Sequence, residues 1–157
     1  MIKQINLGLK IKYFFYPKEF YIFDNFSSFQ VEYEGFIFPT AEHAYQAMKF
    51  IKTSPEIFEK IKNSKSAHDA QKLAIENNDK VDLEWNKNEK SIMKNILRSK
   101  INQHPYVLKK LLQSGEREII EDSWRDAKWG WGKNKDGQNF LGQTWMELRK
   151  EYLKIKS

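Results

Sequence analysis

The feature that most constrains the fold of this 157-residue chain is a series of short amphipathic segments, each opened by its own helix start signal. Thr40 and Ser66 are residue types preferred at helix N-caps, Pro55 opens a short apolar segment, and Pro105 fits the first helical position. Asp82 is expected to cap a longer helix. Apolar residues follow each signal three and four positions apart, which is the helical period. The sequence therefore predicts a mainly α-helical protein.

A smaller β contribution is expected near the start of the chain. In FQVEYEGFIF, apolar residues alternate on both sides of Glu34-Gly35, which is the pattern of a hairpin. Ile119-Ile120 is a candidate short strand, and the last helix is expected from about Phe140. We therefore predict a mainly α (α+β) fold, a single compact helix-rich domain over residues 1–157 with a small N-terminal β hairpin.

Composition narrows the classes of function. The chain has no cysteine, which excludes disulfides, thiolate zinc sites and a cysteine nucleophile, and fits a reducing cytoplasm. It shows no long apolar run and no charged-then-apolar N-terminus, so neither a membrane span nor a signal peptide is expected. The net charge of +6 would suit nucleic acid or a phosphorylated ligand. However, the lysines are spread along the chain, which is more typical of a solvated surface.

The stretch PTAEHAYQAMKF carries more polar chemistry than a packing helix needs. Residues three and four apart share a helix face, so Glu42, Tyr45, Gln46 and Lys49 are expected on one side. Glu42 falls in the first turn, where the helix dipole favours a carboxylate. The simpler alternative is an exposed first-turn glutamate that is paired with Lys49.

A second candidate is the glycine-punctuated loop WRDAKWGWGKNKDGQN. It places Asp126 among Trp124, Trp129 and Trp131, although tryptophans in a loop can also plug a core. Two carboxylates beside flat aromatic surfaces suit the cleavage of a glycosidic bond, and aromatic faces hold bases by stacking. The histidines have no metal-ligand spacing, and neither a P-loop nor a serine-hydrolase motif is present.

Several motifs in a fixed order carry a family resemblance. They are D-N-F, F-P-T-A-E-H-A-Y-Q-A-M-K-F, a tryptophan ahead of a basic helix, E-D-S-W-R-D-A-K-W-G-W-G and G-Q-N-F-L-G-Q-T-W-M-E-L-R. Over roughly residues 13–153 the chain resembles the NADAR family, which includes the YbiA-like N-glycosidases. The resemblance implies an enzyme that needs no metal or other cofactor and hydrolyses the bond between a ribose and a nitrogenous base or amine. It also implies phosphorylated riboflavin-pathway intermediates as substrates.

The resemblance assigns roles to particular residues. Glu42 matches the motif glutamate and is expected to be the principal catalytic carboxylate, with Asp126 as the second. Lys49 would neutralise a phosphate or act as an amine nucleophile on the opened sugar. Trp85 and Trp129 would wall the base pocket. The remaining expected substrate-binding residues are Asn25, Phe26, Tyr45, Gln46, Asn139 and Gly142.

Departures from the family pattern leave the substrate open. Asp24 stands where a serine is usual, Ala44 where an aromatic is frequent, and Trp145 where an aliphatic residue is usual. One alternative is the removal of ADP-ribose from guanine in nucleic acid, which a basic surface would favour electrostatically. Another is a non-catalytic module that binds ADP-ribose, although stacking alone would not require paired carboxylates.

Overall fold

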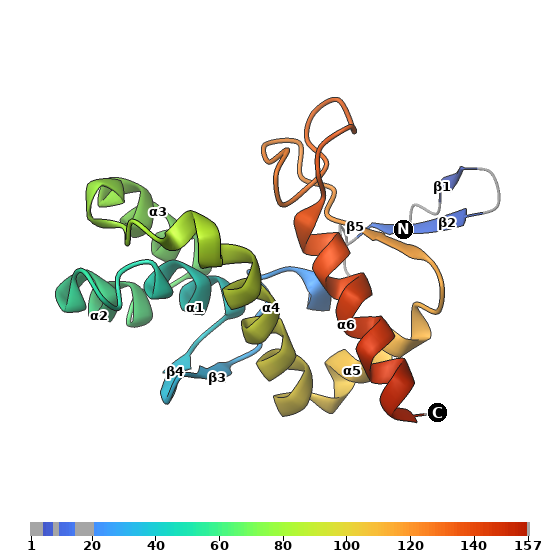
Figure 1. Cartoon of the computed structure of the whole chain (residues 1–157), viewed down its shortest axis with the longest axis horizontal. Coiled ribbons are helices and arrows are strands. Elements are labelled where there is room, and N and C mark those ends of the chain that lie inside the picture. Colours follow the sequence, from blue (N-terminus) through green and yellow to red (C-terminus); the bar gives the residue numbers. More distant parts are fainter. Residues whose placement is uncertain (1–4, 8–9, 15–20, 157) are drawn as a thin grey trace. The chain divides into compact units, whose positions relative to one another are not determined.

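The computed structural model of the chain describes residues 5–7, 10–14 and 21–156 (Figure 1). Most of these residues lie in helices, which confirms the predicted mainly α fold with a small hairpin. The chain forms two compact units: a central unit, Asn25–His104, and a terminal unit that combines Met1–Asp24 with Pro105–Ser157. The single domain over residues 1–157 stays a prediction. Within the described part of the chain, no helix is long and apolar enough to cross a membrane.

The central unit is built around one short helix, α1. This helix is contacted by α2, α3, α4 and both strands of the hairpin (Figure 1). As a result, every residue of α1 is buried, including its polar ones. The elements of this unit are β3 (Val31–Tyr33), β4 (Phe36–Phe38), α1 (Ala41–Met48), α2 (Pro55–Lys62), α3 (Ala67–Glu76), the 3-10 helix η2 (Asn78–Lys80) and α4 (Trp85–Gln103).

The predicted hairpin is confirmed. Strands β3 and β4 pair antiparallel, with Val31 opposite Phe38. Glu34 and Gly35 connect them with φ angles of 52° and 79°. Two successive left-handed residues are typical of the tight turn that matches the twist of paired strands, and glycine adopts such angles readily.

Most predicted helix starts are also confirmed, because local hydrogen bonds decide them. The Thr40 hydroxyl accepts the His43 N–H, and the Ser66 hydroxyl accepts the Asp69 N–H. The expectation for Asp82 was wrong by two residues. The N-cap of α4 is Glu84, and the Asp82 carboxylate instead accepts the Glu84 N–H in the preceding turn.

The terminal unit contains β1 (Ile5–Leu7), β2 (Lys10–Phe14), the 3-10 helix η1 (Tyr21–Phe23), α5 (Pro105–Gln113), β5 (Glu118–Ile120) and α6 (Phe140–Lys156). Its strands lie in the order β1-β2-β5, with β2 parallel to β5 (Figure 1). Strand β5 confirms the prediction at Ile119-Ile120, whereas β1 and β2 were not predicted. Helix α6 contacts β5 and buries Trp145, whose indole N–H donates to the Phe23 carbonyl at 3.0 Å.

Candidate functional site

Glu42 is a buried carboxylate with a fixed direction. It lies in the first turn of α1 and is 5% exposed. Its Oε1 accepts a hydrogen bond from Gln46 Nε2 at 2.7 Å, and its backbone N–H donates to the Asn25 carbonyl at 3.0 Å. A carboxylate is favoured at this position by the helix dipole. The alternative of an exposed first-turn glutamate is therefore wrong.

Tyr45 and Trp85 form an aromatic pair beside this carboxylate. Their ring centroids are 5.2 Å apart and their planes meet at 62°. The Tyr45 hydroxyl donates to Glu89 Oε2 at 3.2 Å. Burial raises the pKa of Tyr45, and the charges of Glu89 and Glu42 raise it further. Tyr45 is consequently a protonated donor at neutral pH and does not act as a base.

Lys49 places its ammonium group over the same aromatic pair. Its Nζ lies 5.1 Å from the Tyr45 ring centroid and 5.7 Å from that of Trp85, within the range of a cation–π contact. The central unit thus brings together the residues predicted on and around the first helix. Gln46 is hydrogen-bonded to Glu42, and the Tyr45 ring contacts both Lys49 and Trp85.

Glu89 is a member of this cluster that the sequence analysis missed. It is 6% exposed, and its bond to Tyr45 crosses from α4 to α1. One signal was available, since Glu89 follows Trp85 by four residues and therefore shares its helix face. The pairing with Tyr45 itself depends on how α4 packs on α1, which sequence spacing does not show.

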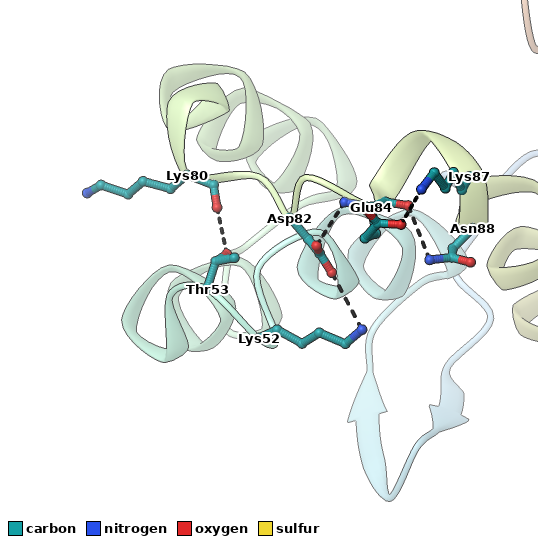
Figure 2. Close-up of polar contacts among 7 residues, drawn as sticks. All are labelled: Lys52, Thr53, Lys80, Asp82, Glu84, Lys87 and Asn88. Carbon is teal, nitrogen blue, oxygen red and sulfur yellow. Dashed lines mark hydrogen bonds and ion pairs between the residues drawn. The ribbon is translucent and has the colours of Figure 1, made fainter.

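The start of α4 is hydrogen-bonded to the chain that follows α1, and this positions Trp85. The Asp82 N–H donates to the Lys49 carbonyl at 3.0 Å. The Asp82 carboxylate lies 3.7 Å from Lys52 Nζ and accepts the Glu84 N–H at 3.0 Å, as Figure 2 shows. Trp85 directly follows these contacts, so its indole is held beside Lys49 and Tyr45.

Asn25 and Phe26 precede the hairpin in the same unit. Asn25 is 6% exposed and uses its carbonyl to hold the first turn of α1 at Glu42. Its side-chain Nδ2 donates to Met93 Sδ at 3.4 Å. Phe26 is half-buried. The backbone of Asn25 is therefore bonded to the backbone of Glu42 at the first turn of α1, while contact of either residue with a sugar stays a prediction.

Asp126 organises the tryptophan loop of the terminal unit. Its Oδ1 accepts the backbone N–H groups of Lys128 and Trp129, both at 2.8 Å. Trp129 is half-buried and packs edge-on against Phe140, with 6.2 Å between the ring centroids. The structure thus shows a loop-forming contact for Asp126. Its catalytic role and the role of Trp129 in the base pocket stay predictions.

The other loop tryptophans separate into a core residue and a surface residue. Trp131 is 7% exposed, packs with Ile120 and donates its indole N–H to Asp122 Oδ1 at 2.8 Å. For this residue, the expected alternative of a core plug from a loop is confirmed. Trp124 is 64% exposed and stacks with the Arg125 guanidinium, 4.8 Å from its ring centroid.

Asn139 and Gly142 join the loop to α6 and to the end of β5. Asn139 donates to the Ile119 carbonyl at 2.9 Å and accepts the Glu121 N–H at 2.9 Å. Gly142 lies so close to the Ile119 carbonyl and the Asn139 amide that a Cβ atom would overlap both. Both residues therefore help to hold the loop, α6 and β5 together. Their predicted contact with the sugar of the substrate stays a prediction.

A pair of substitutions separates the two tasks of Asp126. Asp126→Asn keeps an Oδ1 acceptor for both backbone N–H groups but removes the charge. If the carboxylate is catalytic, we expect kcat to fall by about tenfold or more with the total tryptophan fluorescence spectrum unchanged. Asp126→Ala should disturb the loop as well. If Asp126→Asn turned over as fast as the wild type, the role of Asp126 would be limited to holding the loop. Glu89 would then be the second candidate carboxylate.

His43 is a structural histidine of the central unit. It is 1% exposed, and its Nε2 lies 3.1 Å from the Ser64 carbonyl, which can only accept. Nε2 therefore carries the proton, and Nδ1 accepts from the Thr40 hydroxyl at 2.8 Å. Burial lowers the pKa of His43, so the neutral ring is the form that fits.

This arrangement predicts a pH-dependent stability. Because the pKa of His43 is lower in the folded than in the unfolded chain, the unfolded chain takes up the proton first as pH falls. The contribution is fully present above about pH 6.5 and is lost below it, with a slope of at most about 1.4 kcal/mol per pH unit. Urea unfolding between pH 7.5 and 5 measures it. His43→Gln should flatten the slope, and an unchanged slope would assign it to other groups.

The central unit holds the groups that an enzyme needs to cleave a glycosidic bond. They are the buried carboxylate of Glu42, the second carboxylate of Glu89, the ammonium group of Lys49 and the aromatic rings of Tyr45 and Trp85. Comparison with known proteins agrees with this class. The profile of the NADAR domain matches residues 13–153, which is most of the chain. The chain belongs to the NADAR domain family.

Individual relatives give the same result. The chain is 31% identical to the N-glycosidase YbiA of Shigella boydii over 82% of this chain and 79% of the relative. It is 33% identical to a riboflavin biosynthesis protein of Vibrio vulnificus over 88% of this chain and 38% of that longer protein. The solution structure of Escherichia coli YbiA superposes with a TM-score of 0.83 at 29% identity, covering 91% of this chain and 85% of YbiA.

Proposed function

We propose that this protein is an N-glycosidase that hydrolyses the bond between a ribosyl carbon and a nitrogen in a phosphorylated ribosyl compound. The relatives are named N-glycosidase and riboflavin biosynthesis protein, which favours an intermediate of riboflavin biosynthesis, and within that class we propose a ribosylaminopyrimidine phosphate. The observation that carries the proposal is Glu42, a carboxylate buried in the first turn of α1 and held in place by Gln46.

The chemistry needs an anion close to the anomeric carbon. As the carbon–nitrogen bond breaks, its electron pair leaves with the base and positive charge develops on the sugar. Glu42 stabilises this charge or directs a water molecule to the carbon. The hydroxyl of that water forms the new carbon–oxygen bond, and its remaining proton ends on the departing nitrogen. Burial strengthens the electrostatic effect of a fixed carboxylate.

The aromatic pair and Lys49 would hold the rest of the substrate. Trp85 and Tyr45 offer flat surfaces on which a pyrimidine can stack, and Trp129 is a further wall in the proposal. Lys49 neutralises a phosphate or reacts as an amine with the opened sugar. Asp126 is the proposed second carboxylate. The proposed sugar-lining residues are Asn25, Phe26, Gln46, Asn139 and Gly142.

A second candidate substrate within the same reaction class is guanine that carries ADP-ribose in nucleic acid. The net charge of +6 favours it, because a basic protein attracts a polyanion. In that case, cleavage of a modified DNA strand would weaken steeply with added salt. A small phosphorylated substrate would show a weaker dependence on salt.

A chromatographic assay of the purified chain tests the proposal directly. The substrates are a ribosylaminopyrimidine phosphate and DNA that carries ADP-ribosyl-guanine, with Glu42→Gln as the control for each. Release of the free pyrimidine, lost in Glu42→Gln, is the expected result. If only ADP-ribose were released, from the modified DNA, the substrate would be ADP-ribosyl-guanine and the reaction class would stay the same. Ligand binding without cleavage of either bond would instead favour a non-catalytic binding module.

A further inference from the structure

Asn25 and Gln46 are both hydrogen-bonded to Glu42, the first through its backbone carbonyl and the second through its side chain, and each has a buried side-chain oxygen that no described residue satisfies. These oxygens are Oδ1 of Asn25 and Oε1 of Gln46. Both side chains are more than nine-tenths buried, at 6% and 5% exposed. A buried acceptor without a donor is costly, and native proteins rarely keep one without a reason. Two of them on residues that are bonded to the same buried glutamate indicate that a ligand supplies the donors.

The orientation of the Gln46 amide follows from its partner. A carboxylate can only accept, so the amide group that faces Glu42 at 2.7 Å must be the Nε2 donor. The oxygen atom of the same amide is therefore turned away from Glu42. Holding the carboxylate accounts for the nitrogen of Gln46 and leaves the task of its oxygen unexplained.

Asn25 shows the same division. Its backbone carbonyl, and not its side chain, holds the Glu42 N–H. The side-chain Nδ2 donates to a thioether, Met93 Sδ at 3.4 Å, and sulfur accepts weakly. An apolar side chain of similar size would fill this place equally well in a purely structural role. The amide oxygen is thus the part of Asn25 that packing does not explain.

The two free acceptor oxygens can bind only a part of the proposed substrate that donates hydrogen bonds. A phosphate group presents oxygen acceptors and would leave both amide oxygens unsatisfied. Ribose hydroxyls, in contrast, can donate a hydrogen bond to each of them. We infer that Asn25 and Gln46 accept hydrogen bonds from the hydroxyls of the ribosyl group, so that this site selects ribose over deoxyribose. The inference rests on the proposed function for the identity of the sugar. It makes Asn25 a specificity-determining residue of the reaction.

Binding of simple sugar phosphates tests this selection without any turnover. Calorimetry on the full chain would compare ribose 5-phosphate with its 2-deoxy and 3-deoxy counterparts. We expect at least one deoxy sugar to bind about tenfold to a hundredfold more weakly, because a buried acceptor then loses its donor. Equal affinity for the three sugars, or no detectable binding of ribose 5-phosphate, would overturn the inference.

Two variants of Asn25 assign the selection to its oxygen. Asn25→Leu removes the acceptor at similar volume and should reduce the preference for ribose to about threefold or less. Asn25→Asp keeps an Oδ1 acceptor and should retain the preference. A preference unchanged in a folded Asn25→Leu contradicts the assignment. The wild-type comparison of sugars remains decisive if either variant does not fold.

The inference and the proposed function fail in different ways. Cleavage of a ribosylaminopyrimidine phosphate together with equal binding of ribose and deoxyribose phosphates keeps the function and overturns the inference. Selective binding of ribose 5-phosphate without cleavage of any ribosyl compound overturns the function and keeps the inference.

Discussion

Replacing Glu42 by glutamine should lower kcat by at least about a hundredfold, and nearer a thousandfold, while the protein stays folded. The substitution keeps an Oε1 acceptor for the Gln46 amide and the backbone bond to Asn25. It removes the negative charge and replaces the second carboxylate oxygen by an amide NH2 group, which donates instead of accepting. Because a buried charge costs free energy, the free energy of unfolding should stay the same or rise. Steady-state kinetics and urea unfolding measure the two effects.

A matched control separates this effect from a general loss of acidic charge. Glu76 lies exposed on α3, 4.0 Å from Lys72, and has no place in the proposed site. Glu76→Gln should therefore leave kcat unchanged. If Glu42→Gln turned over as fast as this control, the carboxylate would have no catalytic role. If its stability fell sharply, Glu42 would be needed for folding, and its chemistry would have to be tested by another substitution.

Local signals predicted those parts of the fold that local hydrogen bonds decide. Thr40 and Ser66 cap helices as expected, and Glu34-Gly35 makes the turn of the hairpin. The bonds involved span only a few residues, so the information lies in adjacent letters of the sequence. The misplacement at Asp82 has the same origin. Aspartate is a frequent N-cap, but here its carboxylate binds the N–H of a turn that precedes the helix.

The parts that the sequence could not predict depend on distant pairing. Strand β2 pairs with β5, which lies far along the chain, and this pairing leaves no mark in the adjacent sequence. Among the described residues, strand β1 pairs only with its neighbour β2, so it was missed together with β2 and not because of a distant partner of its own. Glu89 was missed because its bond to Tyr45 joins residues that lie 44 positions apart on two different helices. Such contacts depend on tertiary packing, which the periodicity of apolar residues in the sequence does not reveal.

Helix α1 shows both effects in one element. Spacing placed Glu42, Tyr45, Gln46 and Lys49 on one side, and the contacts among them agree with this. Spacing could not show that the rest of the unit surrounds the helix and buries every residue of it. That burial turns a polar helix face into a candidate site, because each polar group then requires a partner, and the oxygen of Gln46 has none among the described residues.

Gly142→Ala should destabilise the protein by about 3 kcal/mol, although alanine is the better helix former. A Cβ at this position would lie 2.6 Å from Asn139 Oδ1 and closer still to Asn139 Nδ2 and the Ile119 carbonyl. The carbonyl belongs to strand β5 and cannot rotate away, so α6 or the strand must shift. The cost of overpacking exceeds the roughly 1 kcal/mol that alanine gains over glycine within a helix.

Thermal unfolding measures this prediction, with Gly115→Ala as the matched control in the same unit. Gly115 has a φ of 61°, and no atom of the described residues lies within 4 Å of the position that an alanine Cβ would take. Only backbone strain of about 1 kcal/mol is therefore expected there. For a chain of this size, the difference corresponds to a Tm about 4–8 °C lower in Gly142→Ala than in Gly115→Ala. If the two variants unfolded at the same temperature, α6 would have room to move away from β5, and the close approach at Gly142 would contribute nothing to the stability of the terminal unit.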